Sequence, residues 1–338
     1  MDEFDSIIIG SGQAAPSLAV ALAKRGDRVA LIEGDRLGGT CVNTGCTPTK
    51  TLRKSARVAH LARRAADFGI TTGPVEVDFA AAMARMRARS ETARKGLTEW
   101  LNGAENLTVV LGWGRFDGRT QDGRFRVAVG DRILLGRQIY LNTGTRPFLP
   151  PVPGIETISA LDNAGLLALT ERPDHLVVVG GSYIGLELGQ IFARLGSRVT
   201  ILHRADRLAE REDADVSGII ADIMRGDGID LRLNARLASV GRSMRGVLVT
   251  LEDGAEIAAS HILFATGRVP NTDKLNLGSV GLTTDARGYL ATDARLKTAV
   301  SGIWALGDIN RRGAFTHTAY HDHEIVLAER DEIGRAHV

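Results

Sequence analysis

Two segments of the chain share one pattern of hydrophobic and polar positions. Residues 7–33 have the pattern of an apolar strand, a glycine-rich turn, a helix that stops at Gly26 and a second apolar strand that ends at Glu33. Residues 177–203 repeat this pattern at a constant offset of 170 positions, with Gly196 as the helix stop and His203 at the end. A strand, glycine turn and helix in this order are typical of a βαβ nucleotide-binding module. The sequence therefore predicts an α/β fold with two Rossmann-like dinucleotide-binding domains.

Each module carries small residues at the turn where the backbone would approach a pyrophosphate. Such a turn and the helix N-terminus that follows it offer backbone N–H groups to an anion. The positions expected to line the two pyrophosphate sites are Gly10, Gly12 and Ala15 in the first module, and Gly180, Ser182 and Gly185 in the second. Ser182 stands where a glycine is usual, which is the one departure from the pattern.

The two modules differ at the residue that would face the ribose. Glu33 can accept hydrogen bonds from ribose hydroxyls and would repel a 2′-phosphate, which suits FAD or NAD. His203 takes the equivalent place, and Arg204 and Arg207 follow it. The loss of the carboxylate and the gain of these arginines favour a 2′-phosphate, so NADPH is expected and NADH is less favoured. The alternative is that the arginines only face solvent.

The rest of the chain predicts further elements of an α/β protein. A helix is expected over 79–100, with a buried apolar stripe at helical spacing, and strands at 108–111, 124–129 and 139–142 predict a β-meander. The four prolines between positions 147 and 153 indicate a linker. The stripe consists of Phe79, Met83, Met86, Ala93, Leu97 and Trp100.

Composition and charge narrow the class of protein. The chain is 44% hydrophobic and 24% charged with a formal net charge of +2, which gives no basis for a nucleic-acid partner. The N-terminus has no signal-peptide pattern, and no apolar run is long enough to span a membrane. We therefore expect a soluble, cytoplasmic protein.

Cys41 and Cys46 are the only cysteines in the chain, and they lie just downstream of the first module. As a staple they would close a very short loop, which contributes only about 2 kcal/mol in the loop-entropy model. With Thr47 as N-cap and Pro48 as the first helical residue, a helix N-terminus would favour the Cys46 thiolate. The pair is therefore predicted to be a redox couple.

Five motifs together resemble the pyridine nucleotide-disulfide oxidoreductases, a family that includes dihydrolipoamide dehydrogenase, glutathione reductase and mercuric reductase. Mercuric-reductase-type members are the most similar. The resemblance implies a discontinuous FAD domain formed by residues 1–148 and 271–331, and an NAD(P)H domain formed by residues 149–270. The motifs are Gly39 to Lys50, Thr143 to Pro147, Gly180 to Glu187, Ala265 to Asn271 and Ala305 to Asp308.

The resemblance also implies a role for individual residues. Electrons would pass from NADPH through FAD to a Cys41–Cys46 disulfide, with Cys46 next to the flavin and Cys41 as the thiolate that attacks the substrate. Tyr183 would gate the nicotinamide site, and Lys50 would pair with Glu187 near the flavin. Asp308 would bind the ribityl chain. The remaining positions expected to contact the cofactors are Gly39, Thr40, Thr143, Gly144 and Gly267.

The resemblance leaves the electron acceptor open. A soft metal ion such as Hg(II) and a small-molecule disulfide both accept attack by a thiolate, so reduction of either remains possible. Relatives continue into a C-terminal dimerisation domain, so a homodimer is expected only when that domain is present. Residues 332–338 resemble a non-native tail, and a flavin-binding fragment without turnover is the alternative of another class.

Three histidines near the end of the chain raise the question of a metal site. His317, His321 and His323 have the spacing of a helix face, and no other pair of ligands lies near them in the sequence. We therefore expect no metal there. We expect instead a helix that starts near Thr316 or His317.

Overall fold

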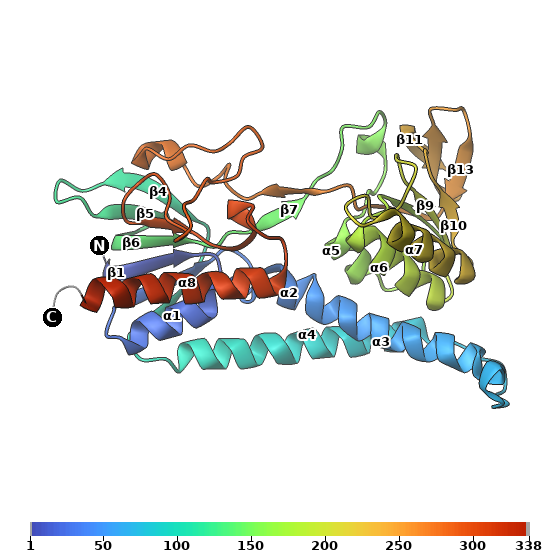
Figure 1. The fold of residues 1–338 in the computed structure, drawn as a ribbon, viewed down its shortest axis with the longest axis horizontal. Helices are drawn as coiled ribbons and strands as arrows, with labels where there is room; N and C mark the ends of the chain where they lie inside the picture. Colours follow the sequence, from blue (N-terminus) through green and yellow to red (C-terminus); the bar gives the residue numbers. More distant parts are fainter. Residues whose placement is uncertain (1, 336–338) are drawn as a thin grey trace. The chain divides into compact units, whose positions relative to one another are not determined.

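The computed structural model describes residues 2–335, which form two compact units (Figure 1). Two helices after the first βαβ module do not lie wholly in the first unit. Helix α3 Cys46–Arg63 belongs to the second unit, and α4 Phe79–Asn102 is divided between the two. The first unit contains the described residues up to Asn43, residues Glu91–Arg146 and the described residues from Arg268 onward. The second unit contains Thr44–Ser90 and Pro147–Gly267.

The first unit is built on one large sheet with the strand order β3-β2-β1-β6-β5-β4, and β16 also pairs with β6. Strands β3, β2, β1, β6 and β16 run parallel, whereas β4, β5 and β6 form an antiparallel meander. The parallel strands are apolar along most of their length because both faces are covered. The strands are β1 Asp2–Ile9, β2 Val29–Glu33, β3 Leu107–Leu111, β4 Gly114–Arg119, β5 Phe125–Val129, β6 Arg132–Leu141 and β16 Ile303–Ala305.

Helices cover the parallel part of this sheet. An ion pair of 2.6 Å between Arg330 of α8 and Asp27 of the loop after α1 fastens α8 beside the first module. Strands β7 Thr145–Pro147 and β15 Arg268–Pro270 form a separate pair. The helices are α1 Ala15–Lys24, α2 Gly39–Asn43, the second half of α4 Phe79–Asn102, and α8 Thr316–Arg335, with short 3₁₀ turns at η3 Leu277–Val280 and η4 Gly307–Asn310.

The second unit has a parallel sheet with the order β10-β9-β8-β14 and a three-stranded antiparallel sheet, β11-β12-β13. Its strands are β8 His175–Val179, β9 Arg198–Leu202, β10 Asp230–Arg232, β11 Leu237–Ser243, β12 Gly246–Leu251, β13 Glu256–Ala259 and β14 His261–Phe264. Its helices are α3 Cys46–Arg63, α5 Asn163–Ala168, α6 Tyr183–Arg194 and α7 Ala214–Gly226, with 3₁₀ turns at η1 Ala65–Phe68 and η2 Ile155–Thr157.

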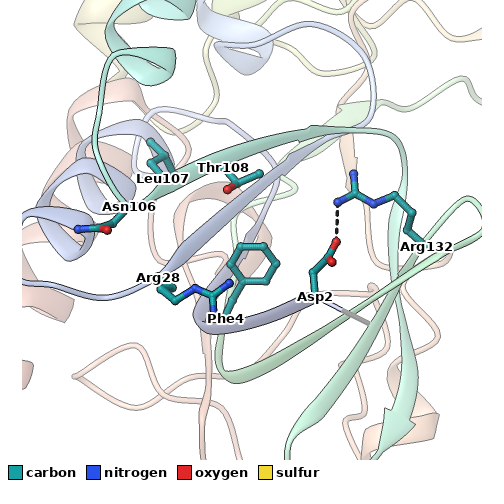
Figure 2. Close-up of a pocket in the computed structure, with 7 residues that line it drawn as sticks. All are labelled: Asp2, Phe4, Arg28, Asn106, Leu107, Thr108 and Arg132. Carbon is teal, nitrogen blue, oxygen red and sulfur yellow. Dashed lines mark hydrogen bonds and ion pairs between the residues drawn. The ribbon is translucent and has the colours of Figure 1, made fainter.

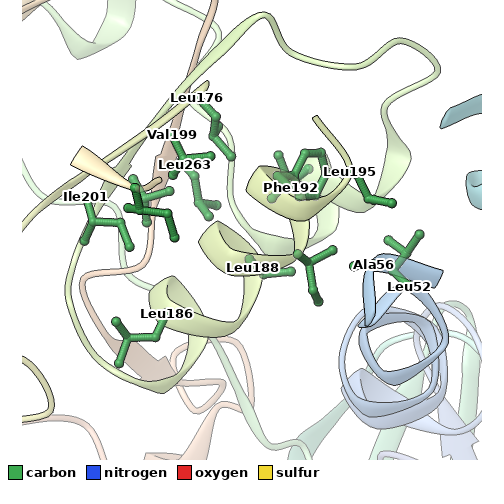
Figure 3. Packing of buried hydrophobic residues seen from close by; sticks show 14 of the residues in the cluster. Leu52, Ala56, Leu176, Leu186, Leu188, Phe192, Leu195, Val199, Ile201 and Leu263 are labelled. Atoms are coloured by element: carbon green, nitrogen blue, oxygen red, sulfur yellow. The ribbon is translucent and has the colours of Figure 1, made fainter. Parts of the chain in front are cut away.

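Helix α3 and the first half of α4 belong to the core of the second unit. Leu52 of α3 is fully buried with the apolar face of α6 (Figure 3), and the rings of Phe79 and Phe192 lie 5.9 Å apart. Burial of large side chains at about 1.5–3 kcal/mol each explains why α3 stays on α6. Residues 44–90 were expected in the first domain, whereas in the structure they pack in the second unit.

Several predicted elements agree with the structure and two need correction. Both βαβ modules are confirmed as β1-α1-β2 and β8-α6-β9, and α8 starts at Thr316 as expected. Residues 108–111 lie in β3, which pairs in parallel with β2, so they are not part of the meander. The α4 stripe is buried through Met86, but Trp100 is 46% exposed, so its assignment to the core is wrong.

Candidate active site

The turn of the first module packs directly against the end of β6. Gly10 has a left-handed φ of +94°, and a Cβ there would lie 2.5 Å from the carbonyl oxygen of Asn142. A Cβ on Gly12 would lie 2.7 Å from the Asn142 Oδ1, and one on Gly39 would lie 3.0 Å from the Gly12 Cα. The backbone contact leaves no room for a side chain at Gly10, and a Cβ at Gly12 or Gly39 would require its neighbour to shift, so bare backbone lines this turn.

Glu33 binds the same turn from the end of β2. Its Oε2 accepts hydrogen bonds from the Ser11 backbone N–H at 3.0 Å and from the Ser11 hydroxyl at 2.5 Å, and its Oε1 accepts from the Asp35 N–H at 2.9 Å. A carboxylate has about four acceptor sites, so one remains on Oε1. Glu33 therefore both shapes the turn and keeps an acceptor for a ribose hydroxyl.

The residues around this turn fit a dinucleotide such as FAD. The Asn142 amide donates to the Leu306 carbonyl at 2.8 Å, while its Oδ1 is buried beside Gly12 with no hydrogen-bond partner in the described part of the chain. A buried acceptor without a partner indicates a group that a ligand or a water completes. The site lies at the carboxyl ends of the parallel strands, where such folds bind nucleotides.

The motifs around Thr143 and Asp308 also meet in the first unit. The Thr143 hydroxyl donates to the Asn271 carbonyl at 3.0 Å, and the Asn271 N–H donates to the Gly144 carbonyl at 3.0 Å. Asp308 accepts from the Thr145 hydroxyl at 3.1 Å, which leaves its other carboxylate oxygen for a hydroxyl of a ligand. Thr40 is exposed in α2, and Gly267 lies in the second unit, where its carbonyl accepts from the Phe148 N–H.

Asp322 anchors the Asp308 turn to α8. This buried carboxylate accepts from the Gly307 N–H at 2.7 Å and from the Asn310 side chain at 3.1 Å. Burial raises the pKa of Asp322 above its ordinary value. Through these two hydrogen bonds α8 holds the turn that contains Asp308.

The second module repeats the close packing of the first. A Cβ on Gly180, whose φ is +120°, would lie 2.4 Å from the Ala265 carbonyl oxygen, and a Cβ on Gly185 would lie 2.0 Å from the Gly180 carbonyl oxygen. Helix α6 starts at Tyr183 with Ser182 as its N-cap, although Ser182 makes no capping hydrogen bond. The predicted turn therefore forms, with an exposed serine in the middle.

His203 contacts the glycine turn of the second module. It is buried, and its Nδ1 accepts a hydrogen bond from the Gly181 N–H at 3.1 Å, so this nitrogen carries no proton. Its Nε2 lies 3.1 Å from Glu210 Oε1. Arg204 is exposed, and Arg207 donates to the Glu210 carbonyl at 3.1 Å.

Cys41 lies in α2, within the first unit. The hydroxyl of Thr316, the first residue of α8, donates to the Cys41 Sγ at 3.5 Å. The Asn43 side chain donates to the Leu37 carbonyl at 3.0 Å, which holds the end of α2 to the loop before it. A hydroxyl donor favours the charged form of a sulfur, so Thr316 suits a reactive thiolate at Cys41.

Cys46 is the first residue of α3, in the second unit. The expected N-cap, Thr47, is wrong, because Gly45 is the cap and Pro48 is the third helical residue. Proline is tolerated there because the first four N–H groups of a helix have no partner within it. Cys46 therefore still lies in the first turn, where the helix dipole favours a thiolate.

Lys50 follows Cys46 by about one turn of α3. Its ammonium donates to both carboxylate oxygens of Glu187 of α6, each at 2.7 Å, so the predicted pair is present in the structure. At the other end of α3, Arg63 donates to the Arg194 carbonyl at 2.6 Å. Helix α3 is thus held on α6 at both ends, which places Cys46 and Lys50 on a firmly supported element.

Tyr183 is 46% exposed at the start of α6. Its hydroxyl donates to Glu212, and this hydrogen bond raises the pKa of Tyr183. No sequence pattern points to Glu212, because the contact joins residues of two different segments.

The histidines of α8 do not gather into a ligand set. His321 pairs with Glu324 at 2.8 Å, and the His323 ring contacts the Tyr320 carbonyl. Across residues 2–335, no group of three or more His, Cys, Asp or Glu side chains has a geometry that could hold a metal ion. No helix in that range has the length and apolar character needed to cross a bilayer.

A cavity of about 400 Å³ lies at the opposite edge of the first sheet (Figure 2). Asp2, Leu107 and Arg132 begin strands β1, β3 and β6, so this cavity is at the amino ends of the strands. Dinucleotide-binding sheets use the carboxyl ends. The glycine-lined turn, and not this cavity, is therefore the candidate cofactor site.

The fold and the two glycine turns define a protein with two dinucleotide-binding modules. A family model described as pyridine nucleotide-disulphide oxidoreductase matches residues 4–322. The chain belongs to this family, whose members are flavin-dependent enzymes that use a pyridine nucleotide. Residues 336–338 of the expected non-native tail lie outside the described residues.

Individual relatives share this fold at moderate identity. The probable pyridine nucleotide-disulfide oxidoreductase RclA of Escherichia coli is 37% identical over 98% of this chain and 71% of its own length. A mercuric reductase of Streptomyces lividans is 35% identical over 94% of this chain and 67% of its own length. The structure of RclA, described as an HOCl-induced flavoprotein disulfide reductase from Escherichia coli, matches 96% of this chain over 70% of its own length, with a TM-score of 0.86.

Proposed function

We propose that this chain passes two electrons from NADPH, in preference to NADH, to a Cys41–Cys46 disulfide and on to a sulfur or soft-metal acceptor. One observation carries the proposal. The only two cysteines of the chain lie in consecutive helices after the first nucleotide module, and the helix that begins with Cys46 also holds Lys50 against Glu187 of the second module.

The first unit would hold FAD, which when bound supplies two-electron transfer between a nicotinamide and sulfur. Gly10, Gly12 and Gly39 would admit the pyrophosphate, because no side chain fills the turn. Glu33 would accept a ribose hydroxyl, and Asp308 a hydroxyl of the ribityl chain. Ala15, Thr40, Thr143 and Gly144 are assigned to the same cofactor by their place in the motifs, and Gly267 by its place in the Ala265 to Asn271 motif.

The cysteines would carry the reaction with the acceptor. Reduction of the disulfide by two electrons and two protons yields two thiols, of which Cys41, beside the Thr316 hydroxyl, attacks. With a disulfide acceptor, the Cys41 thiolate forms a mixed disulfide and expels one thiol. Cys46 then attacks the Cys41 sulfur, which releases the second thiol and restores the Cys41–Cys46 disulfide. Lys50 and Glu187 orient the flavin side of the site, and Tyr183 gates the nicotinamide.

The first candidate reaction is the reduction of a soft metal ion such as Hg(II), as in mercuric reductases. The second candidate is the reduction of a disulfide of the glutathione or dihydrolipoamide type. Relatives named for both chemistries match nearly all of this chain. A Cu(II) complex of RclA is among the similar structures, which adds Cu(II), a borderline metal ion, as an acceptor to test. The alternative from another functional class is a chain that binds flavin but does not turn over any acceptor.

Titration of the chain's own thiols tests the proposal directly. Because the chain has two cysteines, the oxidised, FAD-loaded protein should show no thiol on denaturation, and two after anaerobic reduction with NADPH. Cys46→Ser should show one thiol under both conditions and lose turnover of an added acceptor by at least about a thousandfold. Thr51→Ser, one turn further along α3, is the control. If the number of thiols in the parent chain does not change on reduction with NADPH, the cysteines are not a redox couple and only flavin binding remains as a function.

The preference for NADPH depends on Arg204. This exposed guanidinium follows the strand end that would face the ribose, so Arg204→Glu should lower the NADPH-to-NADH ratio of flavin reduction rates. The expected change is on the order of 5- to 150-fold, which corresponds to about 1–3 kcal/mol for a lost charge-assisted contact. Arg245→Glu, at the β11–β12 turn, makes the same charge change elsewhere. Equal ratios in both variants would remove Arg204 from the nucleotide site.

A further inference from the structure

The internal repeat shows how the second module replaces the carboxylate of the first. Glu33 accepts the Ser11 N–H at 3.0 Å, and His203 accepts the Gly181 N–H at 3.1 Å. Each pair occupies the same positions of the repeat, one in each module. The imidazole therefore takes over the structural duty of the carboxylate, which is to hold the glycine-rich turn to the end of the second strand.

This hydrogen bond decides what His203 can offer a nucleotide. Because Nδ1 is the acceptor, the ring proton sits on Nε2, and that atom is buried without a well-aligned hydrogen bond in the described residues. A second proton on the ring would displace the Gly181 N–H. A neutral Nε2–H can donate equally well to a ribose hydroxyl or to a phosphate oxygen, so His203 does not distinguish NADH from NADPH.

The charge that can distinguish them belongs to Glu210. Its Oε1 lies 3.1 Å from His203 Nε2, and its side chain is 46% exposed, so the carboxylate is open to a ligand at this edge. The Arg207 guanidinium contacts the main-chain carbonyl of Glu210, so this contact leaves the carboxylate charge in place. The second module therefore also has a carboxylate, that of Glu210, which contacts the side of the His203 imidazole opposite to the glycine turn.

We infer that Glu210 is a specificity-determining residue that weakens the binding of a 2′-phosphorylated nucleotide. This inference rests on the proposed role of the second module as the NAD(P)H site. A carboxylate accepts a hydrogen bond from the ribose 2′-hydroxyl of NADH but repels the 2′-phosphate of NADPH. Arg204 acts in the opposite direction, so the two residues set a small preference between them.

Binding of nucleotide fragments to the FAD-loaded chain tests Glu210 without turnover. Calorimetry with adenosine 2′,5′-bisphosphate and with 5′-AMP gives the ratio of their affinities. Glu210→Gln, which keeps the shape and removes the charge, should raise this ratio in favour of the bisphosphate roughly three- to tenfold at low salt. High salt should shrink the change, because the Debye length falls to about 3 Å at 1 M. Glu256→Gln, on the three-stranded sheet, is the charge-matched control and should leave the ratio unchanged.

A double-mutant cycle tests whether His203 positions Glu210. In the His203→Asn background, Glu210→Gln should change the ratio less than it does in the parent. If Glu210→Gln alone leaves the ratio as in the parent or in Glu256→Gln, the inference is overturned. If the parent chain binds neither fragment, and neither NADPH nor NADH reduces its flavin, the proposed function itself is overturned and the inference with it. Binding of both fragments with no effect of Glu210→Gln would overturn the inference alone.

Discussion

Gly10→Ala should yield a purified chain that lacks FAD. The Cβ would lie 2.5 Å from the Asn142 carbonyl oxygen and 2.8 Å from its carbon, and both are backbone atoms that cannot rotate away. The φ of +94° adds strain of about 1–3 kcal/mol for a residue with a side chain. We expect the FAD affinity to fall at least about a hundredfold, which corresponds to about 3 kcal/mol. The ratio of flavin to protein absorbance and titration with FAD measure it.

Gly26→Ala separates backbone strain from the clash. Gly26 has a nearly identical φ of +97°, but no atom lies within 4 Å of the position that its Cβ would occupy. This variant should lose about 1 kcal/mol of stability and remain yellow. If Gly10→Ala bound FAD as tightly as Gly26→Ala does, the glycine turn of the first module would not be the flavin site.

The βαβ modules could be predicted because their signals are local. Strand, turn and helix follow one another within about thirty residues, and the glycines mark the one turn that must approach another backbone. The repeat also placed Glu33 and His203 at equivalent strand ends, and the structure confirms that both contact the turn. What the repeat could not show is that His203 Nδ1 accepts the hydrogen bond from the Gly181 N–H and that Glu210 lies beside its Nε2.

Features that depend on tertiary contacts were missed. Residues 44–90 follow the first module in sequence, yet the apolar face of α3 matches α6, and only packing decides between those neighbours. Thr316 and Cys41 are 275 positions apart in the sequence, and Tyr183 and Glu212 are 29 apart. No local sequence pattern links the members of either pair. Asn142 directly follows strand β6 and has no distinctive sequence context. Its place in the candidate cofactor site is seen only because its Oδ1 lies beside Gly12.

Gly185→Ala should leave a yellow protein that NADPH no longer reduces. Gly185 lies in the first turn of α6, and a Cβ there would lie 2.0 Å from the carbonyl oxygen of Gly180, in the turn that would bind the nucleotide. To relieve this contact, α6 or the turn must move, and either change spoils the anion site at the helix N-terminus. We expect reduction by NADPH to slow at least about a hundredfold, or about 3 kcal/mol, as measured by stopped-flow absorbance.

The effect of Gly185→Ala should be confined to one module, because the two nucleotide turns belong to separate compact units. The FAD content and reduction by dithionite, which needs no nucleotide site, should match the parent. Gly218→Ala in α7 is the control, since its Cβ would meet no atom within 4 Å, and it should be neutral or stabilise the chain by up to about 1 kcal/mol. Loss of FAD from Gly185→Ala, or normal reduction by NADPH, would contradict the assignment of NADPH to the second module and FAD to the first.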